Sequence, residues 1–200
     1  MLEIILIQPG ATEYDDAQRI KGNLSFPLSD NGRRQVERMV AEVSPERIEA
    51  VFAAPCQSAQ ETAQLVAQPF GAKVRTVDEL QNIDHGLWHG RLIEEIKRQQ
   101  PKAYRQWQEH QQPVSPPEGE SLSHARQRVR PFLQRLLRRR KKGVVALVVP
   151  EPLASVIRSE LRHESLGDLW KSECDQGTWV RIPISAEGRA VSAQAAPRAG

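Results

Sequence analysis

Four consecutive branched apolar residues near the start of the chain, Ile4, Ile5, Leu6 and Ile7, limit the possible folds more than any other feature. The run ends in Gln8-Pro9-Gly10, where proline and glycine interrupt regular structure. A short apolar segment bounded in this way is typical of a strand buried on both faces in the middle of a parallel sheet. Open α/β sheets bind ligands beyond the carboxyl ends of their strands. We therefore expect any chemistry to begin at residues 8–10.

Apolar runs with strand character recur along the chain, and segments with apolar residues at helical spacing separate them. The further predicted strands are Ala50–Ala54, Val74–Val77, Val144–Val149 and Trp179–Ile184. The predicted helices are Gly32–Val43, Gln57–Ala67, Arg91–Gln99, Lys102–His110, Ser123–Arg140 and Leu153–Leu161. This alternation predicts an α/β protein with three layers, in which helices cover both faces of a mostly parallel sheet.

The composition is typical of one globular domain. A chain of 200 residues is long enough for a single domain with an ample core, and we assign residues 1–185 to it. Residues 186–200 are rich in Ala, Ser, Gly and Pro, and we predict that they form a flexible tail. The net charge is only +3, which does not indicate a nucleic-acid-binding protein.

Cysteine content and the N-terminal segment bear on the compartment. Cys56 and Cys174 are too few for a disulfide framework, and no Cys/His spacing is typical of a zinc site. The first apolar run has no basic region ahead of it and is too short for a signal peptide or a membrane span. We therefore expect a cytoplasmic protein without a membrane span, a metal or a cofactor.

Several short motifs follow one another in a distinctive order. They are Gly10–Tyr14 with Arg19–Gly22, Pro27–Gln35, Pro55 with Ala59, Thr62 and Ala63, Gly86–Gly90, Pro117–Ser121, and Val156–Arg158. Together they resemble the histidine phosphatase superfamily, which includes the phosphoglycerate mutases and the alpha-ribazole phosphatase type. The resemblance covers residues 2–184, and it implies a phosphoglycerate mutase-like fold.

The resemblance also implies a particular catalytic cluster. In this family a histidine after the first strand attacks phosphorus and becomes phosphorylated. Two arginines bind the phosphoryl oxygens, because a planar guanidinium group matches that geometry. A second histidine, after the fourth strand, stabilises the charge on the transferred group. A carboxylic acid usually protonates the leaving oxygen.

All five positions of that cluster differ in this chain. Gln8 and Pro9 stand where the family has Arg and His, Ser58 aligns with the second arginine, Asn82 with the acid and Glu151 with the second histidine. Proline has no side-chain nitrogen, so the nucleophile is absent rather than weakened. Because two arginines are gone and a carboxylate is added, we expect the site to repel a phosphate dianion. Losing even one oxyanion-stabilising donor typically costs ~3 kcal/mol in the transition state.

These departures predict a pseudoenzyme, a catalytically inactive protein that acts through binding or regulation. The expected partner is a protein: a second copy of the chain, an active relative or another protein. Nucleic acid is a less favoured partner. The alternative function is that of an enzyme that still acts on a phosphorylated small molecule through the substituted side chains.

Other residues on the same loops are weaker candidates for chemistry. His85 and His89 lie four residues apart and could hold a metal ion, although partly exposed side chains without that role are the simpler interpretation. Glu13, Asp15 and Glu151 could gather into an acidic pocket, with Glu151 as the base of a hydrolase. No partner nucleophile or oxyanion-binding group for such a base is evident.

Cys56 and Ser58 are also potential nucleophiles. Cys56 stands at a strand-to-helix turn, where a helix N-terminus could lower its pKa, but a small core residue is the commoner role. Ser58 has no histidine base near it in the sequence.

Positive charge gathers on the helix predicted from Ser123 onward. A solvated helix surface whose cationic end favours the helix dipole is the simplest interpretation. The alternative is a docking surface for an acidic protein, an anionic membrane or a nucleic acid. No aromatic residues alternate with these cations, which disfavours sequence-specific nucleic-acid binding. The candidate surface consists of Arg126, Arg130, Arg138, Arg139, Arg140, Lys141 and Lys142.

Overall fold

Five strands form one mixed sheet at the centre of the computed structural model, which describes residues 1–43, 46–109 and 115–185. Across the sheet the order is β3-β2-β4-β1-β5; β5 is antiparallel to β1, and all other neighbours are parallel. The mostly parallel sheet is therefore confirmed, and the four later strands begin and end within one residue of their predicted bounds. The strands are β1 (Leu2–Ile7), β2 (Ala50–Ala53), β3 (Lys73–Thr76), β4 (Gly143–Val148) and β5 (Trp179–Ile184).

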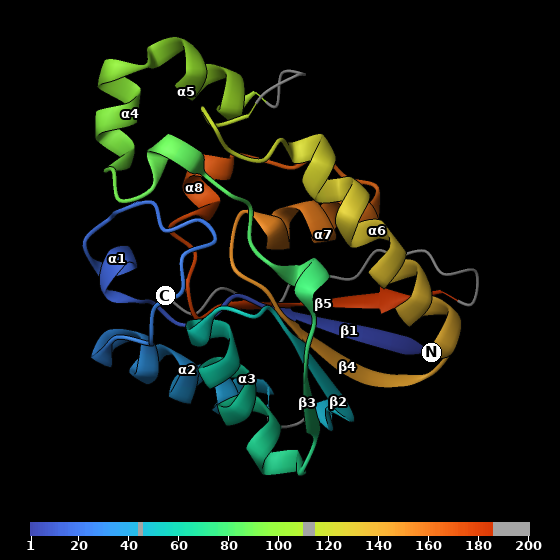
Figure 1. Ribbon diagram of the computed structural model, residues 1–200. Helices are drawn as coiled ribbons and strands as arrows, with labels where there is room; N and C mark the ends of the chain where they lie inside the picture. The colour runs from blue at the N-terminus through green and yellow to red at the C-terminus, as the bar shows by residue number, and fades with distance from the viewer. Residues whose placement is uncertain (44–45, 110–114, 186–200) are drawn as a thin grey trace.

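Helices cover both faces of the sheet, as predicted (Figure 1). On one face α2 (Asp30–Val43) packs against α3 (Gln57–Ala67), and on the other α6 (Leu122–Arg139) packs against α7 (Leu153–Arg162). The helices α4 (Ile93–Gln99) and α5 (Pro101–Gln108) lie near α8 (Leu169–Ser172) in a group of their own. The short elements are α1 (Glu13–Asp16), η2 (Gln68–Phe70), η3 (Asp78–Leu80) and η4 (Gly86–Trp88).

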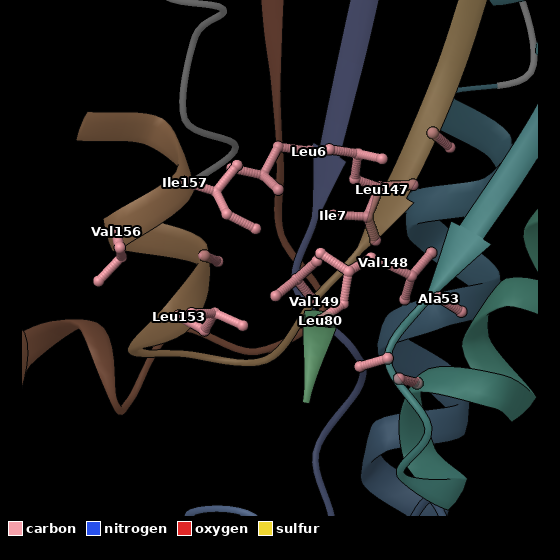
Figure 2. Packing of buried hydrophobic residues seen from close by; sticks show 14 of the residues in the cluster. Leu6, Ile7, Ala53, Leu80, Leu147, Val148, Val149, Leu153, Val156 and Ile157 are labelled. Carbon is pink, nitrogen blue, oxygen red and sulfur yellow. The ribbon is translucent and has the colours of Figure 1, made fainter. Parts of the chain in front are cut away.

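The apolar run of β1 is buried on both faces, as its composition predicts. Residues 4–7 are fully buried, and Leu6 pairs in register with Leu147 of β4. Figure 2 shows Leu6 and Ile7 among the buried side chains, together with Leu153 and Ile157 of α7. The middle strand is β4 rather than β1, because β5 adds an antiparallel edge beyond β1. Since β1 and β4 are parallel neighbours, the residues that follow them meet at the same edge of the sheet.

An aromatic cluster joins α5 and α8 to the loop around η4. The rings of Tyr104 and Trp170 are stacked, with centroids 5.0 Å apart and planes 4° from parallel. Trp88 contacts both Trp107 and Trp170 at centroid distances of 5.9 and 5.4 Å. The indole N–H of Trp170 donates to the carbonyl of Tyr104 at 3.0 Å. These contacts hold α5 against α8 and against the loop around η4.

Residues 186–200, where the sequence predicts a tail, lie outside the described residues, as do residues 44–45 and 110–114. Within the described ranges, every helix is too short or too polar to cross a membrane.

Candidate functional site

Gln8 and Pro9, at the end of β1, are held by the segment that leads into β5. The backbone N–H of Gln8 donates to the carbonyl of Thr178 at 2.9 Å, and the Thr178 hydroxyl donates to Gln8 Oε1 at 2.8 Å. The carbonyl of Pro9 accepts from the N–H of Gly177 at 2.8 Å. Both Gln8 and Pro9 are buried. The segment before β5 therefore binds the backbone N–H and side-chain oxygen of Gln8 and the carbonyl of Pro9.

Glu151 lies just beyond β4 and faces Gln8. Gln8 Nε2 donates to Glu151 Oε1 at 3.1 Å, and the N–H of Ser155 in α7 donates to Oε2 at 3.0 Å. Burial raises the pKa of the Glu151 carboxyl, while the hydrogen bonds from Ser155 and Gln8 and the charge of Arg158 lower it in part. Burial therefore favours the neutral form of this carboxyl.

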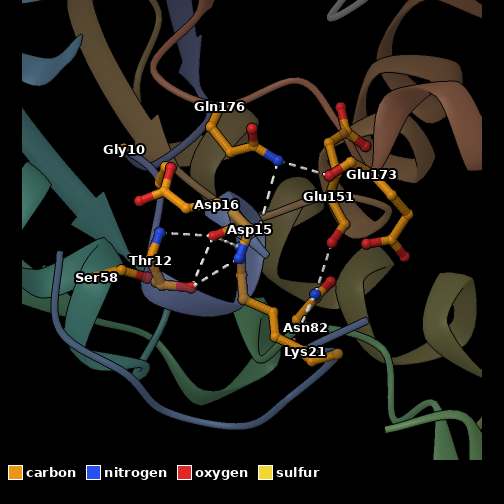
Figure 3. A network of polar contacts seen from close by, with 12 residues as sticks. Gly10, Thr12, Asp15, Asp16, Lys21, Ser58, Asn82, Glu151, Glu173 and Gln176 are labelled. Atoms are coloured by element: carbon orange, nitrogen blue, oxygen red, sulfur yellow. Dashed lines mark hydrogen bonds and ion pairs between the residues drawn. The ribbon is translucent and has the colours of Figure 1, made fainter. Parts of the chain in front are cut away.

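Asn82, in the loop after η3, is hydrogen-bonded to the loop that contains Gly22 and to the segment from Glu151 to Leu153. Its Nδ2 donates to the carbonyl of Gly22 at 2.9 Å and to that of Glu151 at 2.7 Å. Its Oδ1 accepts from the N–H of Leu153 at 3.3 Å. Figure 3 shows the contact between Asn82 and Glu151. All the strong hydrogen-bonding groups of the Asn82 amide are thus aimed at backbone atoms of this protein.

Ser58 stands in the first turn of α3, near the loop after β1. Its hydroxyl lies 3.8 Å from Cys56 Sγ, and the side chains of both residues are buried in the described structure. The loop itself is joined to α3 by a hydrogen bond from the N–H of Gly10 to Thr62 Oγ1 at 3.2 Å. The simpler interpretation of Cys56 holds, because the residue belongs to the hydrophobic core.

The candidate positions are almost wholly buried. Exposed fractions are 5% for Gln8, 1% for Ser58, 2% for Asn82 and 6% for Glu151. Gln8, Asn82 and Glu151 form one hydrogen-bonded network, whereas the Ser58 hydroxyl contacts Cys56 instead. Only a small fraction of each of these residues is therefore accessible to a phosphate ester.

The acidic residues proposed for a shared pocket do not gather. Asp15 accepts two hydrogen bonds from Lys21 Nζ, at 2.5 and 2.6 Å, and one from Gln176 at 3.4 Å (Figure 3). Glu13 is exposed on α1, and Glu151 is buried against Gln8. The expectation of an acidic pocket is therefore wrong, because Lys21 neutralises Asp15 and the other two carboxylates face elsewhere.

His85 and His89 are fixed by protein groups. His85 is fully buried, which corrects the expectation of partial exposure; its Nε2 lies 2.9 Å from Glu173 Oε1, close but not aligned as a hydrogen bond. The N–H of His85 donates to His89 Nε2 at 3.3 Å, so that ring nitrogen acts as an acceptor. Burial, and then the charge of His85, lower the pKa of His89. Among the described residues no group of three or more potential ligands is placed to hold a metal ion.

Several cations of α6 lie in ion pairs with other elements. Arg126 and Arg130 both contact Glu160 of α7, at 3.5 and 2.7 Å, and Arg140 contacts Glu49 at 3.1 Å. Three of the seven residues of the predicted anionic-partner surface are therefore engaged within the molecule. The other four lie at the end of α6 and just beyond it.

A family model for the histidine phosphatase superfamily, branch 1, matches residues 4–196. This chain belongs to the histidine phosphatase superfamily. Within that superfamily, phosphoserine phosphatase 1 of Hydrogenobacter thermophilus is 28% identical over 182 residues, which are 91% of this chain and 86% of the relative. The adenosylcobalamin/alpha-ribazole phosphatase of Escherichia coli is 24% identical over 92% of this chain and 91% of its own length.

A solved structure agrees with the family assignment. Mycobacterial glucosyl-3-phosphoglycerate phosphatase superposes with a TM-score of 0.82 at 20% identity, and the match covers 94% of this chain and 96% of that one. The phosphoglycerate mutase-like fold inferred from the order of the motifs is confirmed.

Sequence reasoning missed the residues that complete the network. Thr178 and Ser155 carry no motif, and each contacts Gln8 or Glu151 only because the sheet brings distant segments together. The pair of Asp15 and Lys21 offered one usable signal: opposite charges six residues apart in a segment that turns back on itself. The pair of His85 and Glu173 offered none, because 88 residues of chain separate its members.

Proposed function

We propose that this member of the histidine phosphatase superfamily is catalytically inactive and acts by binding another protein. One observation carries the proposal: Pro9 stands at the end of β1, the place that the family resemblance gives to the nucleophilic histidine. A prolyl ring has no atom that can attack phosphorus. Glu151, at the end of the neighbouring strand, has no nitrogen to replace it.

The polar network beneath Pro9 supports the same proposal. Gln8, Asn82 and Glu151 satisfy one another and nearby backbone groups, so an entering phosphate must break existing hydrogen bonds. It must also approach a buried carboxyl, which is neutral at best and repels the dianion when ionised. Both effects oppose the binding that phosphoryl transfer requires.

The second candidate function is phosphomonoester hydrolysis through the substituted side chains. It is favoured by the names of the relatives, which include a phosphoserine phosphatase and an alpha-ribazole phosphatase. Such an enzyme would need Ser58 or water as the nucleophile and Glu151 as a proton acceptor, and both side chains are buried in the closed network.

A phosphatase assay on the purified chain separates the two functions. Phosphate release from p-nitrophenyl phosphate and from phosphoserine should equal the buffer background, with an active histidine phosphatase as the positive control. Turnover that Glu151→Ala or Ser58→Ala abolishes would establish the enzyme and overturn the proposal. Turnover that survives both substitutions would indicate a contaminating phosphatase, so the assay includes both variants.

Anion binding gives an independent measurement. Orthovanadate mimics the transferred phosphoryl group, and titration calorimetry should detect no heat of binding to this chain. Binding of vanadate that Glu151→Ala alters would show that the loops open and would favour the second function.

A further inference from the structure

Four cations at the end of α6 form a compact exposed cluster. Arg138 and Arg139 lie in the last turn of α6, and Lys141 and Lys142 follow in the turn that leads into β4. All four side chains are exposed, and none makes an ion pair with any residue that the structure describes. Their four positive charges exceed the net charge of the whole chain, which is +3.

The rest of the helix contrasts with this cluster. Arg126 and Arg130 share Glu160, Arg128 forms a two-point contact with Glu120, and Arg135 contacts Glu79. These four arginines face three carboxylates, so the pairs offset most of the charge toward the N-terminus of the helix. Four cations at the end of α6 and just beyond it have no ion pair with a described residue; we call Arg138, Arg139, Lys141 and Lys142 the basic cluster.

The helix dipole accounts for only half of the basic cluster. Cations in the last turn of a helix face the partial negative charge of its carbonyl end, and this explains Arg138 and Arg139. Lys141 and Lys142 lie beyond the helix, where that effect fades. Two further like charges so close together repel one another, which an outside anion would relieve.

We propose that the basic cluster docks a short acidic segment of a partner protein. This inference rests on the proposed binding function and names the chemistry of the partner. Arginine guanidinium groups can form two parallel hydrogen bonds with a carboxylate, and the flexible side chains of lysines can also reach carboxylates. A run of Asp or Glu therefore complements a cluster of two arginines and two lysines. The cluster lies at the amino end of β4, whereas Glu151 follows its carboxyl end (Figure 1).

The surroundings of the cluster favour a short acidic segment over an extended polyanion. Glu49, whose side chain is half exposed, lies beside Gly143 and accepts a hydrogen bond from Arg140. A nucleic-acid backbone or an anionic membrane extends well past four side chains and would meet this carboxylate and the carboxylates paired with the rest of α6. A short peptide can place its carboxylates on the four free cations alone.

The test is a titration of the full chain into a fluorescent peptide of about five glutamates, followed by anisotropy at low ionic strength, about 50 mM. We expect binding that weakens steeply as salt is raised to about 300 mM. R138E/R139E/K141E/K142E should weaken binding at least tenfold. The matched control R34E/R38E/R98E/K102E makes the same change in net charge at four scattered exposed positions and should weaken it less than threefold.

Duplex DNA and vesicles with roughly a third of phosphatidylserine are titrated in parallel. Tighter binding of either, lost in the cluster variant, would overturn the choice of an acidic protein. No binding of the peptide at low salt, or equal losses in both variants, would overturn the docking surface itself. R138Q/R139Q/K141Q/K142Q repeats the test without new acidic groups, in case charge reversal unfolds α6. None of these results depends on whether the chain hydrolyses phosphate esters.

Discussion

At the scale of single residues, Glu151 makes the stability of the fold depend on pH. Its pKa is raised by burial, so the folded state holds the proton more tightly than the unfolded state. Its contribution to stability is complete below the pKa of an unfolded glutamate, about 4.3, and is lost as the pH rises through the raised folded-state pKa. Glutamine has nearly the same shape and no proton to lose.

We therefore expect Glu151→Gln to become more stable relative to the parent chain as the pH rises from about 4.5 to about 8. The amide can still be satisfied, since Gln8 and the Thr178 hydroxyl can reverse their donor and acceptor roles. Urea unfolding of both proteins across this range measures the difference. Glu13→Gln, at an exposed position, controls for the loss of a charge; a difference that does not change with pH would contradict the prediction.

The pair of Asp15 and Lys21 makes a second prediction at this scale. Their side chains are 5% and 10% exposed, so removing one charge leaves the other poorly solvated. Asp15→Asn should cost roughly 3–5 kcal/mol of unfolding free energy, because Lys21 would remain buried without its partner. The double variant Asp15→Asn with Lys21→Met should lose clearly less. Equal losses in the single and double variants, measured by urea unfolding, would mean that the pairing itself contributes little.

At the scale of helices and strands, the sequence predicts the elements that have a clear local pattern of apolar residues. The strands were predictable because unbroken apolar runs and flanking breakers mark them, and β5 has its predicted bounds. The helices α1 and α8 were not, because four residues are too short to show a period. Thr12 and Asp168 cap them, and those caps were the only local signals.

For the candidate site, the sequence likewise predicted the local features but not the long-range contacts. The positions of Gln8, Asn82 and Glu151 followed from motif order, because the family frame fixes which loops meet at the carboxyl edge of the sheet. Their closure did not follow, since it depends on contacts such as that between Thr178 and Gln8, which 170 residues of chain separate. For the same reason the partner of His85 could not be predicted.

Trp170 gives a prediction for the α4–α5–α8 group. It is 3% exposed, stacks on Tyr104 and contacts Trp88. Trp170→Ala should cost about 3–5 kcal/mol and loosen α5 from α8, so trypsin should cleave faster at Lys102 and Arg105. Trp170→Phe retains an aromatic ring and should protect both sites largely as the parent chain does. Unchanged cleavage in Trp170→Ala would show that other contacts hold α5.

At the scale of the whole molecule, β4 lies between the basic cluster and the network of Gln8, Asn82 and Glu151. The basic cluster precedes the strand and the closed network follows it, so six residues at about 3.3 Å each put roughly 20 Å between them. Substitutions that far apart, with no shared partner, usually have additive effects on stability. The free-energy change of R138Q/R139Q/K141Q/K142Q combined with Glu151→Gln should therefore equal the sum of the separate changes within about 0.5 kcal/mol.

Peptide binding gives a second test of whether the two regions are independent. Glu151→Gln should leave the affinity for the glutamate peptide unchanged, because the substitution replaces a buried ionisable group by an amide and alters no surface charge near residues 138–142. Anisotropy titrations of the parent chain and Glu151→Gln compare the two affinities. A shift of more than about threefold, or stabilities that fail to add, would mean that β4 transmits changes between its ends. In that case binding of a partner at the basic cluster would change the stability of the network around Glu151, and the two regions would be coupled.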